Sequence, residues 1–276
     1  FLIMSTLSLL MIGVFFKNSF ALVKKITIFA LIICLPLVYV NFGNQILVFN
    51  NSYSINAFSN LLKIIILISS AFSLIFTGQY LKRINIEKFE YMILILSSTI
   101  GMFVMVSAND LIGLYLGIEL QSLSLYVLSS LDRKSLNSSE SGVKYFVLGA
   151  LSSGLFLYGC SLIYGFTGST NYLMISENLS VENIGIIFGL VFVIVGLAFK
   201  ISAVPFHMWT PDVYQGSPTS VTAFFALAPT VAGMGPFIQL LFLGIRGARP
   251  VPGAAGQRCC HARGARRRQA HLEARP

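Results

Sequence analysis

Long apolar segments constrain this chain more than any other feature of its sequence. A membrane-spanning helix needs about 20 predominantly apolar residues. Eight segments reach or approach that requirement: 1–16, 24–42, 56–79, 89–107, 110–131, 141–167, 184–207 and 218–244. Only 11% of the 276 residues are charged, against about 25% in soluble domains. The segments are apolar on all sides, which is typical of helices surrounded by lipid or by other helices. We therefore predict an all-α, polytopic transmembrane bundle of about eight spans.

The loops between the predicted spans alternate in charge. The second loop is uncharged, the fourth holds Asp110, and the sixth holds Glu177 and Glu182. The first, third and fifth loops, with the span ends beside them, are basic through Lys17, Lys24, Lys25, Lys82, Arg83, Lys88, Arg133 and Lys134. Because basic loops stay on the cytoplasmic side of a membrane, we predict that these three loops face the cytoplasm or an equivalent matrix.

The last residues differ from the rest of the chain in composition. We divide the chain into a membrane domain, 1–244, and a basic tail, 245–276, which is rich in Arg, Ala and Gly and which we expect to be aberrant or disordered. Most of the formal net charge of +9 lies in this tail, so the charge gives no reason to expect a nucleic-acid partner. Cys259 and Cys260 lack partners at metal-ligand spacing, and we expect no metal site. Because the chain starts within an apolar run, we expect its N-terminus to be incomplete.

Ionisable residues within the spans are the candidate functional residues. A charge at bilayer depth costs about 2.5–3.5 kcal/mol on insertion scales, so such residues tend to face the bundle interior and mark ion pathways. Glu119 lies near the middle of its span, with Gln121, Ser122 and Ser124 around it. The alternative to a functional role is a neutral carboxyl group that is hydrogen-bonded within the bundle.

Lys200 lies deep in the segment 184–207. Pro205 removes the hydrogen bond to the carbonyl of Ile201, which predicts a break in the helix, and a broken helix at membrane depth is tolerated where it lines protein or water. His207 follows at a spacing that places it on about the same helix face, and it titrates near neutrality. It is therefore a candidate relay, although His207 and Trp209 are equally well explained as membrane-interface residues.

Two further lysines admit a simpler explanation. Lys144 and Lys63 each lie near one end of a span, so each could extend its ammonium group to the membrane surface. Glu119 and Lys200 nevertheless provide an acid and a base on different helices. Moving a counter-charge toward a buried lysine changes its proton affinity, and this is the physics that a conformationally or electrostatically driven proton pump requires.

Three motifs carry a resemblance to a known family. They are YLGIELQSLSLYVLSSL (115–131), GVKYFVLGALSSGLFLYGCSLIYGFTGSTN (142–171) and GLAFKISAVPFHMWTPDVYQGSPTSVTAFFALAP (196–229). The chain resembles subunit N of the proton-pumping NADH–quinone oxidoreductase (respiratory complex I), in the family of antiporter-like membrane subunits. The likeness extends from about residue 1 to about residue 243, and the third motif is the most specific.

The resemblance implies roles for individual positions. Glu119 matches a glutamate of the fifth helix that couples electrostatically to a neighbouring subunit, and Lys144 matches a lysine of the sixth helix. Lys200 matches the lysine of the broken seventh helix, a proton donor and acceptor, and Pro205 matches the proline that breaks this helix. Thr230 departs from the family, which usually has a lysine there. A hydroxyl group can pass a proton on but cannot hold the charge, so Thr230 is a candidate relay only.

The family also continues beyond the region of resemblance. About six more helices follow in it, including a second broken helix, as expected of an inverted-repeat transporter fold. Nothing after residue 244 resembles them. We therefore expect that this chain, which resembles the first half of the fold, does not complete a proton path by itself.

The resemblance implies a non-redox subunit of a proton-translocating NADH:quinone oxidoreductase, which couples quinone reduction to proton transfer and has no redox centre of its own. We expect no cofactor in it, with NADH, FMN, iron–sulfur clusters and quinone in partner subunits. Its expected partners are other membrane subunits of complex I and the lipid bilayer, in a bacterial inner membrane rather than a mitochondrial one. Two alternatives stay open: a Na⁺/H⁺ antiporter subunit of the same superfamily, and a truncated, non-functional membrane fragment. A soluble redox enzyme is not indicated, because the chain has no nucleotide-binding glycine motif and no iron–sulfur cysteine cluster.

Overall fold

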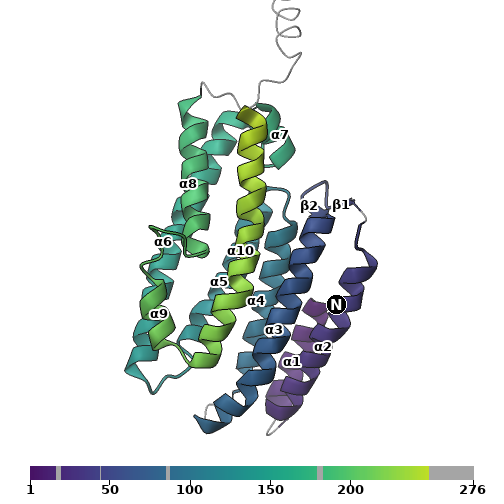
Figure 1. The fold of residues 1–276 in the computed structure, drawn as a ribbon, viewed down its shortest axis with the longest axis vertical. Coiled ribbons are helices and arrows are strands. Elements are labelled where there is room, and N and C mark those ends of the chain that lie inside the picture. Colours follow the sequence, from purple (N-terminus) through teal and green to yellow (C-terminus); the bar gives the residue numbers. More distant parts are fainter. Residues whose placement is uncertain (17–19, 44, 85–87, 179–182, 249–276) are drawn as a thin grey trace, which may run out of the picture.

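A computed structural model describes residues 1–16, 20–43, 45–84, 88–178 and 183–248 as a bundle of helices (Figure 1). The elements, in chain order, are α1 (Leu2–Phe15), α2 (Phe20–Val40), β1 (Ile46–Val48), β2 (Tyr53–Ile55), α3 (Ala57–Arg83), α4 (Glu90–Ser107), α5 (Leu111–Ser129), α6 (Leu136–Thr167), α7 (Tyr172–Asn178), α8 (Ile184–Lys200), α9 (Thr210–Gly216) and α10 (Thr219–Ala248).

The predicted all-α membrane fold is confirmed, with a helix in each of the eight predicted segments. In the part of the chain that the structure describes, six helices are long and apolar enough to cross a membrane, namely α2, α3, α4, α5, α6 and α10, whereas α1 and α8 are shorter apolar helices. The segment predicted over 184–207 was wrong at its end, because α8 stops at Lys200. The sequence did not predict the β1–β2 hairpin, α7 or α9. The predicted basic tail falls largely on residues 249–276, which lie outside the described residues.

Local sequence signals begin and end several of these helices. Asp110 begins α5, where its side chain accepts a hydrogen bond from the backbone N–H of Gly113 (2.8 Å). Ser135 does the same for α6 through the N–H of Ser138. At the other end of α6, Gly168 adopts a left-handed conformation (φ +70°) and donates to the carbonyl of Tyr164 (2.8 Å). These are the residue types that satisfy the unpaired backbone groups at helix ends.

The second, fourth and sixth loops meet at one end of the bundle. The N–H of Asn109 donates to the carbonyl of Ser52 (2.9 Å), and the N–H of Leu111 donates to the carbonyl of Thr170 (3.0 Å). The side chain of Asn109 also donates to the carbonyl of Asn51 (2.8 Å). The β1–β2 hairpin and α7 therefore lie at the same end (Figure 1). This is the alternation that the loop charges predict, since these are the three loops that lack basic residues.

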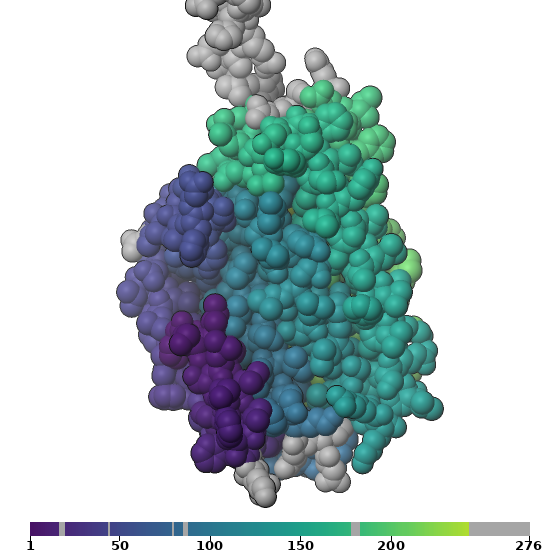
Figure 2. All heavy atoms as spheres, turned by 180° about the vertical axis from the view of Figure 1, so that it is seen from behind, coloured from purple at the N-terminus to yellow at the C-terminus, as the bar shows by residue number. Residues whose placement is uncertain are grey.

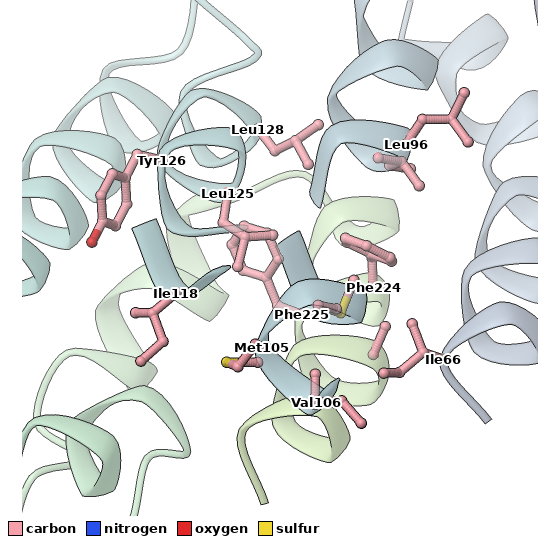
Figure 3. Close-up of a cluster of buried hydrophobic side chains, with 14 of the residues drawn as sticks. Ile66, Leu96, Met105, Val106, Ile118, Leu125, Tyr126, Leu128, Phe224 and Phe225 are labelled. Atoms are coloured by element: carbon pink, nitrogen blue, oxygen red, sulfur yellow. The ribbon is translucent and has the colours of Figure 1, made fainter. Parts of the chain in front are cut away.

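The centre of the bundle is packed from three consecutive helices and one that is distant in sequence. Ile66 of α3, Leu96 and Val106 of α4, Leu125 of α5 and Phe224 of α10 are buried against one another (Figure 3). Tyr126 lies on a different face of α5 from Leu128 in this view and is directed away from α3. This core packs against one face of α5, and the Tyr126 face of α5 meets α6 and α8.

Large apolar side chains also cover the outside of the bundle. Exposed examples occur on α2, α3, α5, α6 and α10 and include Phe29, Ile68, Leu116, Val147 and Leu241. Figure 2 shows α1, coloured purple, lying on the surface of the molecule at one side of the bundle. Exposed apolar surface of this extent is unfavourable in water and favourable in lipid. The fold therefore supports a multi-pass membrane location.

Candidate functional site

The end of α8 is the first element of the site. The N–H of Ser202 donates to the carbonyl of Phe199 (3.2 Å), and the N–H of Ala203 donates to the carbonyl of Ala198 (2.9 Å). Ser202 has a left-handed backbone (φ +58°). This is the Schellman pattern, which ends a helix by satisfying its last carbonyl groups. Lys200 therefore lies in the last turn of a helix that stops inside the bundle (Figure 1).

The break differs from the predicted one in its position. Pro205 was expected to interrupt a continuing helix, yet α8 has already ended five residues earlier, and Pro205 lies in the turns that lead to α9. Pro205 has no helical hydrogen bond to remove there. His207 was expected to share a helix face with Lys200, and this was wrong for the same reason. Its side chain is exposed.

Trp209 joins the end of α8 to α6. Its indole N–H donates to the carbonyl of Phe199 (3.0 Å), and its ring stacks on Tyr145 with 4.6 Å between centroids. The residue is only 4% exposed, so it packs within the bundle and does not face lipid. Trp209 therefore fixes the broken end of α8, and with it the backbone of Lys200.

The ammonium group of Lys200 meets two hydroxyl groups of α5. Nζ donates to Oγ of Ser122 (2.7 Å) and to the hydroxyl oxygen of Tyr126 (3.2 Å). It also lies 5.6 Å from the centre of the Tyr126 ring, within the range of a cation–π interaction. Sequence reasoning missed Tyr126. The signal was present, because residues 119, 122 and 126 follow the spacing of one helix face.

Glu119 lies on that same face of α5, one turn before Ser122. Its side chain is part-buried, and among the described residues its Oε1 atom has no hydrogen-bond partner. No ion pair joins Glu119 to Lys200, but the carboxylate acts on the Lys200 ammonium electrostatically. Burial removes water from that ammonium, whereas a nearby negative charge favours it. Glu119 and Lys200, predicted separately, thus belong to one site.

Lys144 lies elsewhere, at the surface between α6 and α9. Its Nζ atom is 2.8 Å from a carboxylate oxygen of Glu140 and 2.8 Å from one of Asp212. These three residues line a shallow pocket of about 170 Å³, together with Asn137, Ser141 and Gln215. Tyr145, the next residue on α6, contacts Tyr126 edge to face at 4.8 Å between centroids. Tyr145 therefore connects the helix that carries Lys144 to Tyr126, which accepts from Lys200.

Thr230 takes no part in this cluster. Its hydroxyl group donates within α10 to the carbonyl groups of Ala226 (2.8 Å) and Leu227 (3.0 Å). Among the described residues, no group of three His, Cys, Asp or Glu side chains is arranged to hold a metal ion. The described site consists of one carboxylate, one ammonium and two hydroxyl groups at the end of a broken helix.

A helix bundle with an acid and a base inside it, one of them at a helix break, is the arrangement typical of polytopic membrane proteins of the transporter class. The chain belongs to the NADH:quinone oxidoreductase/Mrp antiporter transmembrane family, whose sequence profile matches residues 108–248. The matched region contains Glu119, Lys144 and Lys200. The resemblance found in the sequence is thereby confirmed.

Curated relatives agree with this assignment. NADH-quinone oxidoreductase subunit N of Pelagibacter ubique is 52% identical over 244 residues, which cover 88% of this chain and 52% of that protein. The protein of the same name from Parvibaculum lavamentivorans is 49% identical over 251 residues, with 88% of this chain and 51% of that protein covered. The chain therefore spans about half the length of the curated relatives that it matches.

A solved structure gives the same result. A chain of respiratory complex I from Thermus thermophilus, determined with bound aureothin, superposes with a TM-score of 0.76 and 29% identity. The match covers 86% of this chain and 52% of that one. The fold of this chain is thus shared with a membrane subunit of a multi-subunit respiratory complex.

Proposed function

We propose that this chain is a proton-translocating membrane subunit of an NADH–quinone oxidoreductase, corresponding to subunit N, and that it couples quinone reduction to proton transfer. The observation that carries the proposal is the contact of Lys200, at the broken end of α8, with the hydroxyl groups of Ser122 and Tyr126 beside Glu119. Relatives named as subunit N support the same conclusion.

The proposed chemistry is proton storage and release by Lys200. A buried ammonium loses its proton more readily than one in water, and a nearby carboxylate opposes that loss. Protonating Glu119, or neutralising it with a partner's charge, therefore favours release from Lys200. Ser122 accepts from Lys200 and donates to the carbonyl of Ile118 (2.6 Å). It holds the ammonium in place, while the Tyr126 hydroxyl group is available to receive or pass on a proton.

We propose that Lys144 acts at the entrance to this site. Its pairing with Glu140 and Asp212 places an exposed charged cluster in contact with water at the α6–α9 surface. His207, which is exposed after the break, is a second candidate for a role at the entrance. Thr230 is a weaker candidate for a relay, because its hydroxyl group already donates to its own helix.

The remaining assignments follow from the proposed subunit. We propose that it contains no redox cofactor, that NADH, FMN, iron–sulfur clusters and quinone bind to partner subunits, and that those partners include other membrane subunits of the complex. A bacterial inner membrane is the location that the named relatives support.

The test uses the complete subunit within its assembled complex in closed vesicles. We expect Lys200→Ala and Glu119→Ala to lower proton pumping and coupled quinone reduction together, each by at least tenfold, since a positioned proton-transfer group contributes about 10²–10⁴-fold. Glu119→Asp should be milder because it keeps the carboxylate. Lys25→Ala, at an exposed lysine of α2, serves as the control.

Unchanged pumping and quinone reduction in Lys200→Ala would contradict the proposal. A second experiment applies a Na⁺ gradient to the same vesicles to test for Na⁺/H⁺ exchange. If the wild-type vesicles exchange Na⁺ for H⁺ without any quinone reduction, the chain is an antiporter subunit instead.

A further inference from the structure

A second buried lysine lies far from the proton-transfer site, on α3. Lys63 is only 5% exposed, and it lines a pocket of about 360 Å³ between α1, α2, α3 and α4. The other lining residues include Cys34, Leu37, Tyr53, Ile100 and Phe103. The proposed function makes no use of this pocket.

The charge of Lys63 is stabilised only by aromatic rings. Its Nζ atom lies 5.2 Å from the centre of the Tyr53 ring and 5.9 Å from that of Phe103. No carboxylate lines the pocket, and among the described residues no hydrogen bond or ion pair to Lys63 is found. A buried cation normally has an anionic partner, because losing water without one is costly. The pocket therefore presents an uncompensated positive charge.

The depth of Lys63 matches the headgroup boundary of a bilayer. Lys63 is the seventh residue of α3, so it lies about 9 Å along the helix from its start. The 27 residues of α3 extend for about 40 Å, which exceeds the hydrocarbon core of about 30 Å. With α3 centred in the bilayer, Lys63 lies about 4 Å inside the hydrocarbon boundary, within reach of a lipid phosphate.

The pocket is open toward the lipid-facing surface. Leu37, which lines it, is an exposed apolar residue of α2, whereas Cys34 and Asn60, which also line it, are buried. Leu37 belongs to the lipid-facing surface of α2. A molecule that is already in the bilayer can thus enter from the side, with its anionic end at Lys63 and its apolar end along Leu37 and Ile100.

We propose that this pocket binds one anionic phospholipid, with the lipid phosphate on Lys63 and an acyl chain between α1, α2 and α4. The apolar walls of the pocket favour the acyl chain, and the unpaired ammonium group of Lys63 favours the phosphate. The depth of Lys63 in the bilayer matches the level at which the phosphate of a phospholipid lies. The lipid belongs to the leaflet on the side of the β1–β2 hairpin, because α3 begins at that hairpin.

The experiment uses the assembled complex in phosphatidylcholine nanodiscs with a small fraction of phosphatidylglycerol that carries a photoreactive diazirine in its acyl chain. After irradiation, we expect cross-linked peptides at residues 34–41 and 100–104. Lys63→Gln should lower this labelling about tenfold or more, as expected for losing a charge-assisted hydrogen bond. Lys82→Gln is the matched control, because Lys82 is an exposed lysine at the other end of the same helix.

Two further variants test the pocket with Lys63 retained. Val38→Trp places a large ring in the pocket and should also abolish the labelling, whereas Ile68→Trp, on the lipid-exposed face of α3, should not. The melting temperature of Lys63→Gln in detergent shows whether this variant folds. If it does not, Val38→Trp and Ile68→Trp test the lipid pocket on their own.

Several outcomes would overturn the proposal. Equal labelling of the wild type and Lys63→Gln is one, and equal labelling by a phosphatidylcholine probe is another. Loss of labelling on adding millimolar inorganic phosphate would assign the pocket to a free anion. A structure of the complex that shows a segment of a partner protein in the pocket would mean that this segment, and not a lipid, occupies it.

Discussion

Three lysines on the apolar helices differ in what surrounds their ammonium groups. Lys200 contacts two hydroxyl groups with a carboxylate nearby, Lys144 is paired with two exposed carboxylates, and Lys63 lies among aromatic rings. Only Lys200 combines burial with a counter-charge that is not locked into an ion pair. That combination suits the proton storage and release that we propose for Lys200, because burial disfavours the charged form and a nearby carboxylate favours it.

At the same scale, we predict the effect of removing one hydroxyl group. Tyr126→Phe should lower the initial rate of proton pumping severalfold, less than Lys200→Ala does, because Ser122 still accepts from Lys200. Acidification of closed vesicles measures this rate. The matched control is Tyr158→Phe, at an exposed tyrosine of α6. If both variants pump at the same rate, Tyr126 has no part in the transfer.

At the scale of the helices, Gly101 of α4 and Gly117 of α5 allow the backbones of these two helices to approach each other closely. A Cβ atom on Gly101 would lie 2.5 Å from the backbone nitrogen of Gln121, and one on Gly117 would lie 2.6 Å from that of Met105. Small residues allow such backbone contact between membrane helices. The contact matters for the site, because α5 carries Glu119, Ser122 and Tyr126.

We predict that Gly117→Ala separates α4 from α5 and destabilises the protein by about 1–3 kcal/mol, the usual cost of overpacking. Its melting temperature in detergent should fall. Gly154→Ala, on α6, is the control, since nothing lies within 4 Å of the added Cβ atom. That variant should be neutral or slightly stabilising, because alanine is favoured over glycine in a helix by about 0.5–1 kcal/mol. Equal melting temperatures for both variants would contradict the close contact.

The whole molecule has two chemically different ends. The hairpin, the loop at Asn109 and the loop at Thr170 are hydrogen-bonded together at one end, whereas Arg133, in a loop, and Lys82 and Arg83, in the last turn of α3, lie at the other end. This segregation predicts the orientation of the bundle in the membrane. It also places the lipid pocket of Lys63 on the side opposite to the basic loops.

This orientation predicts which loops are accessible from each side. In a variant without native cysteines, Gln45→Cys should react with a membrane-impermeant maleimide in intact cells. Arg133→Cys should react only in inside-out vesicles. Both positions are exposed, so accessibility across the membrane, and not burial, decides the labelling. The reverse pattern of labelling would show that the bundle has the opposite orientation in the membrane.

The sequence by itself determined the membrane fold, the position of each long helix and the identity of Glu119 and Lys200 as unusual charges. It could do so because apolar length and buried charge are local properties, readable without knowing what packs against what. Only the tertiary structure decided that α8 ends at Lys200, that Tyr126 and Ser122 receive its ammonium, and that Lys144 and Lys63 lie elsewhere. Those outcomes depend on contacts between helices that are distant in sequence, and apolarity on all sides of a helix does not specify which neighbour each face meets.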